Sequence, residues 1–162
     1  MARKHDEEEG VQLTDEVGNG PRVYEAGFHL DPELASEEVK KAYGEIRENI
    51  VASGTLVAEV EPHNIPLAYT ISRQETSGRR DFDSAYFAWI AYEATPEAHE
   101  GISSAIHADK RVIRALDVVT TKEAARHALE MHDIAEKTSD RTSGSEEDIN
   151  EELDAALENV AV

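Results

Sequence analysis

The first apolar repeat along the chain has a period of two and lies in residues 22–31. Side chains of a strand alternate between its two faces, so this repeat predicts a strand with one buried face. The pair Asp31-Pro32 is expected to end it. The apolar positions are Tyr24, Ala26, Phe28 and Leu30.

Three later segments have the spacing of a helix. Residues 36–52 repeat apolar side chains every three or four positions, which predicts an amphipathic helix that ends at Gly54. Thr95-Pro96 is typical of a helix start, because a capping hydroxyl is followed by proline at the first helical position. This second helix is expected to run to about residue 108, and residues 122–137 are expected to be helical again.

The remaining apolar runs are short and rich in β-branched and aromatic residues, which predicts strands. They lie at residues 55–61, 67–72, 82–93 and 112–121, with a kink or bulge at 62–66 and a loop at 73–81. The order is therefore β-α-β-β-α-β. It predicts an α+β, ferredoxin-like domain with a four-stranded antiparallel sheet, both helices on one face and the other face free. Within residues 82–93, Tyr86 is expected to face one way, and Phe87 and Trp89 the other.

Charge divides the 162-residue chain unevenly. There are 35 acids and 16 bases, for a net charge of −19. Residues 1–21 hold 6 acids and 2 bases, and residues 129–162 hold 11 acids and 2 bases, so the two ends carry 13 of the 19 excess charges. The acidic mean field disfavours bare nucleic acid, DNA included, and anionic membranes as partners.

This division predicts four parts. Residues 1–21 are expected to be a disordered acidic arm, 22–122 the ferredoxin-like domain, 123–137 a helical extension, and 138–162 an acidic linker with a short amphipathic helix. The apolar stripe of that last helix includes Ile149, Leu153 and Leu157.

The sequence offers no chemistry typical of an enzyme. It has no cysteine, no Gly-x-Ser-x-Gly turn and no phosphate-binding loop, and its seven histidines have no known ligand spacing. No apolar run approaches the roughly 20 residues that a membrane span needs, and acids stand where a signal peptide would be apolar. We therefore expect a cytoplasmic, non-enzymatic protein without cofactor or metal.

The few bases of the central region gather at three places. Arginine is suited to phosphate because its planar fork binds two oxygens at once. A local basic patch can bind phosphates even though acids elsewhere on the chain repel them, because charges are screened beyond about 8 Å at physiological salt. The alternative is ordinary surface arginines paired with neighbouring acids. The bases are Arg22; Arg73, Arg79 and Arg80; and Lys110, Arg111 and Arg114.

Five short pieces in this order resemble the bacterial small-subunit ribosomal protein six family. They are Arg22-x-Tyr24-Glu25, Leu30-Asp31-Pro32, Leu67-Ala68-Tyr69-x-Ile71, Tyr86-Phe87-x-Trp89 with Glu93, and Val112-Ile113-Arg114. The resemblance implies a ferredoxin-like fold without enzymatic activity, on the ribosome. It also implies binding to small-subunit ribosomal RNA as a heterodimer with small-subunit ribosomal protein eighteen, which is basic.

Carried over residue by residue, the family's bases match Arg22, Arg73 and Arg114. The chain departs from the family before Leu67, where His63-Asn64-Ile65-Pro66 replaces a glycine and one or two bases. Arg79 and Arg80 are candidates to replace those bases. The partner surface is expected to include Tyr86, Phe87, Trp89, Ile149, Leu153 and Leu157.

Two other functions are compatible with the pattern. One is a ferredoxin-like dimer that binds a small molecule, or acts as an oxygenase, in a pocket on the free sheet face. The other is an acidic interaction module that works through the tail helix alone.

Overall fold

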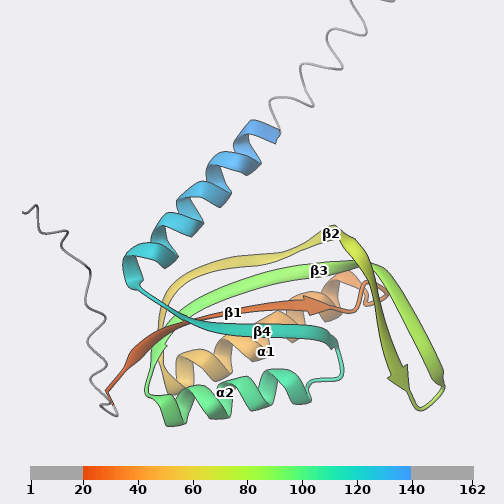
Figure 1. The fold of residues 1–162 in the computed structure, drawn as a ribbon, viewed down its shortest axis with the longest axis horizontal. Helices are drawn as coiled ribbons and strands as arrows, with labels where there is room; N and C mark the ends of the chain where they lie inside the picture. Colours follow the sequence, from red (N-terminus) through yellow and green to blue (C-terminus); the bar gives the residue numbers. More distant parts are fainter. Residues whose placement is uncertain (1–19, 140–162) are drawn as a thin grey trace, which may run out of the picture.

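The computed structural model describes residues 20–139 (Figure 1). The six elements of the domain follow the predicted order, and a further helix, helix 122–139, comes after them. The elements are β1 (Arg22–Leu30), α1 (Ser36–Ser53), β2 (Thr55–Glu75), β3 (Gly78–Ala94), α2 (Pro96–Ala108) and β4 (Val112–Thr120). None of the described helices is long and apolar enough to span a membrane.

The four strands form one antiparallel sheet in the order β2-β3-β1-β4. Figure 1 shows α1 and α2 side by side on one face of this sheet. The main core lies between these two helices and the sheet, and the predicted apolar positions of β1 are all less than 5% exposed there. The ferredoxin-like prediction is therefore confirmed.

Local sequence explains where both helices meet the sheet. The hydroxyl of Thr95 accepts a hydrogen bond from the backbone N–H of Ala98, and Pro96 opens α2. At the end of α1, a side chain on Gly54 would lie 2.6 Å from the carbonyl oxygen of Glu93. Only glycine permits that close approach of α1 to β3.

The predicted loop at residues 73–81 is wrong. β2 continues to Glu75 and β3 begins at Gly78, so Thr76 and Ser77 alone form the turn. The segment is polar, which hid its strand character, but the polar side chains pair across the two strands: Ser72 donates to Asp81, and Thr70 to Asp83, both at 2.5 Å. Register shifts between Val60 and His63 and between Pro66 and Ile71 let β2 pass residues 62–66 as one bulged strand.

The far end of the β2–β3 hairpin bends past the end of β1 toward the side of α1 and α2 (Figure 1). Arg73 and Arg80 thereby come close to residues that are far away in the sequence.

The second face of the sheet was expected to be free of helices, but it is partly covered by one. Helix 122–139 lies against part of it, on the side opposite α1 and α2 (Figure 1). Ala125, fully buried, packs in a cluster with Ala58 of β2 and Ala91 of β3, and Leu129 packs against the same cluster. Lys122 forms an ion pair with Glu93 of β3. We call the uncovered part of this face, over β1, β4 and the adjoining parts of β3 and β2, the open face.

Two predicted parts lie outside the described residues. They are the acidic arm, except for its last two residues, and the tail helix with Ile149, Leu153 and Leu157.

Candidate nucleic-acid interface

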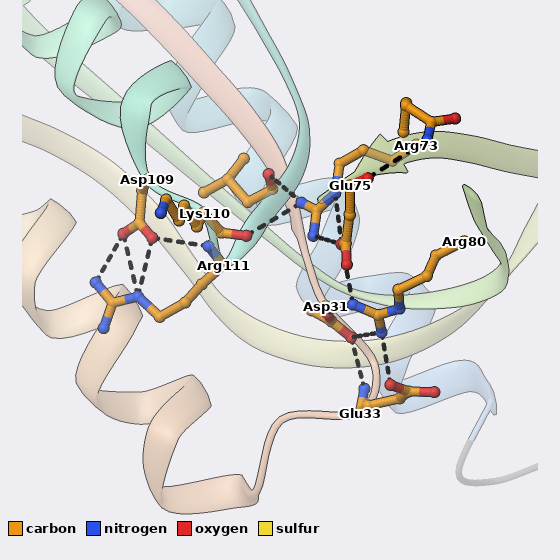
Figure 2. A network of polar contacts seen from close by, with 10 residues as sticks. Asp31, Glu33, Arg73, Glu75, Arg80, Asp109, Lys110 and Arg111 are labelled. Atoms are coloured by element: carbon orange, nitrogen blue, oxygen red, sulfur yellow. Dashed lines mark hydrogen bonds and ion pairs between the residues drawn. The ribbon is translucent and has the colours of Figure 1, made fainter. Parts of the chain in front are cut away.

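Arg80 lies at the centre of an ion-pair network between the hairpin and the end of β1 (Figure 2). Its Nη1 donates to Asp31 Oδ2 at 2.9 Å and to Glu75 Oε1 at 3.1 Å, and its Nη2 donates to Glu33 Oε2 at 2.6 Å. Asp31 is only 7% exposed, and its Oδ1 also accepts the backbone N–H of Glu33 at 2.9 Å. The carboxylates, led by the hydrogen bond to Asp31, raise the pKa of Arg80 above its usual range.

Arg73 links the same hairpin to β4 (Figure 2). Its guanidinium donates to Glu75, and its Nη1 donates to the carbonyl oxygens of Lys110 and Val112, each at 3.1 Å. The hydrogen bond from Arg73 lowers the pKa of the Glu75 carboxyl, although some desolvation opposes it. We call Asp31, Glu33, Arg73, Glu75 and Arg80 the latch, because together they hold the hairpin against β1 and β4.

Arg111 is also bound to acids. It meets Asp109 with Nε at 2.9 Å from Oδ1 and Nη2 at 2.7 Å from Oδ2, and it reaches Glu45 of α1 at 2.6 Å. This bidentate hydrogen bonding from Arg111 lowers the pKa of the Asp109 carboxyl. Arg79 near the turn is exposed and donates to Asp81 at 3.0 Å.

Arg114 differs from these arginines, because it has no carboxylate partner among residues 20–139. Its Nη1 donates to the hydroxyl of Tyr69, and its guanidinium lies 5.7 Å from the centre of that ring. The pKa of nearby His29 is lowered, first by burial and second by the charge of Arg114. Lys110 and Arg22 form no ion pair within the described part of the chain either, and both are exposed.

The predicted RNA-binding residues therefore do not form one patch. Arg73, Arg80, Lys110 and Arg111 line one hollow between the hairpin and the α2–β4 loop, and Arg114 lies on the open face. Arg22 pairs with Ala94 at the opposite end of β1 from His29, whose partner on β4 is Arg114. Arg22 is thus a strand length away from the others.

The open face carries a groove of about 360 Å³. Phe87 and Trp89 of β3 form one wall, as the predicted partner surface requires, and Leu116 and Val118 of β4 form another. Tyr86, by contrast, packs against the core on the side of α1 and α2. Arg114 and Tyr69 close the groove at one end.

Sequence reasoning did not single out three residues of this groove as site residues: Tyr69, Leu116 and Val118. They are 61%, 69% and 47% exposed. The sequence could have placed Leu116 and Val118 of β4 on this face, because they alternate with Asp117, which faces α2. Tyr69 could not be placed from sequence, because its position depends on the bulge in β2.

Comparison with known proteins agrees with this geometry. The family model described as Ribosomal protein S6 matches residues 23–118. The crystal structure of 30S ribosomal protein S6 from Thermotoga maritima aligns with a TM-score of 0.52 at 14% identity, and the alignment covers 72% of this chain and 98% of that one. No curated protein matches this chain in sequence.

The family match covers well over half of the chain and every element from β1 into β4. It confirms the resemblance. The chain therefore belongs to the ribosomal protein S6 family, and it is a non-enzymatic structural protein of the small ribosomal subunit.

Proposed function

We propose that this chain binds small-subunit ribosomal RNA as a heterodimer with small-subunit ribosomal protein eighteen. In this proposal the open face holds the protein partner, and bases without a carboxylate partner among the described residues bind phosphate. The observation that carries the proposal is the position of Arg114. It is a cation without a carboxylate partner in the described chain, and it lies beside an exposed apolar strip.

The apolar strip supports a protein partner. Leu116 and Val118 lie on β4, an edge strand, and line one groove with Phe87 and Trp89 across β1. Exposed apolar side chains on an edge strand favour aggregation unless a partner covers them. Since the chain carries a net charge of −19, a basic partner is also favoured by long-range attraction.

The available cations support an RNA contact of limited size. Arg73, Arg79, Arg80 and Arg111 already bind carboxylates, so phosphate would have to displace those acids. Arg114, Lys110 and Arg22 have no such competition among the described residues. We therefore assign direct phosphate contact to these three, and assign the latch arginines to holding the hairpin in place. Phosphate contacts of this kind position a protein and do not read sequence.

The RNA contact is tested by measuring the affinity of the full chain and its partner for a small-subunit RNA fragment over a range of salt concentrations. Replacing Arg114 by alanine should weaken binding and reduce the slope of log affinity against log salt by about 1. Lys40→Ala is the matched control, because Lys40 is an exposed cation on α1, away from the open face. If the two variants behave alike, Arg114 does not contact the RNA.

The partner contact is tested separately by co-purification. Val118→Glu should abolish the heterodimer, because it places a charge in the apolar strip. Val51→Glu is the control, because Val51 is 48% exposed and Val118 is 47% exposed, but Val51 lies on α1. Retention of the partner by Val118→Glu would contradict the assignment of the open face. Tight RNA binding by this chain alone would contradict the need for a partner.

A further inference from the structure

We propose that His63 of β2 and three residues of helix 122–139 bind one divalent transition-metal ion such as zinc. The three residues are His132, Asp133 and Glu136, and one ligand atom from each lies within 4.8 Å of the other two. They line a hollow of about 360 Å³ between the helix and β2, and His63 lines it from the opposite side. None of these four residues lines the groove of the open face or is assigned a phosphate contact.

The spacing of the two histidines fits a shared ion. Their ring centres lie 5.5 Å apart. Two imidazoles bound to one tetrahedral zinc ion, with Zn–N bonds of about 2.0 Å, have ring centres roughly 5 Å apart. On the helix, His132 and Glu136 are four residues apart and therefore lie on one face.

The surroundings of His63 leave one ring nitrogen available to a metal. Its Nδ1 lies 3.3 Å from the carbonyl oxygen of Glu61, so the Nδ1-protonated tautomer donates there. A backbone carbonyl that accepts the N–H of one ring nitrogen is the usual second contact of a metal-binding histidine, and it leaves Nε2 as the ligand. Phe87 packs edge-on against the ring at 5.9 Å between centres, which restricts its rotation.

The donor set selects the class of metal. Two imidazoles with carboxylates suit zinc and its neighbours, whereas calcium and magnesium require mostly oxygen ligands. Glu61, an exposed carboxylate of β2, lines the same hollow and adds negative charge. The site joins two elements that are far apart in sequence, so bound metal would fasten helix 122–139 to the sheet. The helix residues lie beyond the part of the chain that the family model matches.

The test is a zinc titration of the untagged, chelator-treated full chain against a chromophoric chelator, with thermal unfolding in parallel. We expect one zinc ion per chain, an affinity at least about tenfold weaker in His132→Gln, and a zinc-dependent rise in melting temperature that this variant loses. His127→Gln is the matched control, because His127 is an exposed histidine on the same helix. Magnesium in place of zinc should have no effect.

His63→Gln tests the bridge itself. Hydrogen exchange of helix 122–139 should slow when zinc is added to the wild-type chain, and it should not change in His63→Gln. The proposal is overturned if the wild-type chain binds no zinc, or if His127→Gln weakens binding as much as His132→Gln. It is also overturned if His63→Gln keeps both the affinity and the zinc-dependent protection.

Discussion

The two faces of the one sheet differ in what their side chains do. On the face toward α1 and α2, Phe28 and Ile90 are fully buried, and the polar groups are paired. The ring of His99 stacks on Tyr24 and lies 2.9 Å from Asp117 Oδ2.

On the other face, helix 122–139 packs on Ala58 of β2 and Ala91 of β3. The open face keeps exposed apolar side chains and Arg114, which has no carboxylate partner among residues 20–139. Since alternate residues of the same strands supply both faces, one strand sequence specifies stability on one side and contact on the other.

The largest expected effect separates the two faces directly. Phe28→Ala should lower the free energy of unfolding by about 3–5 kcal/mol, because it leaves a cavity in the packed core. Leu116→Ala on the open face should change it by no more than about 0.5 kcal/mol, because Leu116 is largely solvated. Chemical denaturation of both variants measures the difference. Similar losses in the two would show that the open face also contributes to the core.

The latch is expected to have the next largest effect. Asp31→Ala removes a buried acceptor of hydrogen bonds from Arg80 and from the backbone of Glu33, and it should cost about 1–3 kcal/mol. Hydrogen exchange in the far half of the β2–β3 hairpin should become faster. Glu100→Ala is the control, because Glu100 is an exposed carboxylate on α2, outside the hairpin. Unchanged exchange in Asp31→Ala would mean that the latch does not hold the hairpin.

The sequence predicted the fold well where the pattern is local. The alternation in residues 22–31 placed every buried side chain of β1, and Thr95-Pro96 placed the start of α2. It failed where partners are distant. Arg80 was assigned to a loop, and its partner Asp31 lies 49 residues away. The contact of Arg80 with Asp31 depends on the bend of the hairpin, which no short window of sequence reveals. The pairs Arg73–Glu75, Arg79–Asp81 and Arg111–Asp109 are only two residues apart and agree with the alternative of arginines paired with neighbouring acids.

The groove of the open face could be predicted only in part, because again only local patterns are visible in the sequence. Phe87 and Trp89 were assigned correctly to one face of the strand, because alternation alone decides this. The proximity of His63 to His132 was not visible, because it arises from the path of helix 122–139 across β2.

The smallest expected effect is a pH dependence of stability that arises on the face toward α1 and α2. Glu59 of β2 accepts hydrogen bonds from Arg47 at 2.7 Å and from Tyr43 at 2.8 Å. The hydrogen bond from Arg47 lowers the pKa of Glu59 below its usual 4.5, against some desolvation. Because the folded pKa is the lower one, this stabilisation is fully present above about pH 4.5 and is lost as the pH falls through the folded pKa.

Glu59→Gln should therefore be less stable than the wild-type chain by roughly 0.5 kcal/mol at neutral pH, a small value because the pair is partly exposed and screened. The difference should be constant between about pH 6 and 7 and should shrink below about pH 4.5. Denaturation at a series of pH values measures it, and Glu61→Gln, an exposed carboxylate two residues further along β2, corrects for the lost charge. A difference that stays constant down to pH 3 would mean that the Arg47–Glu59 contact does not stabilise the packing of α1 on the sheet.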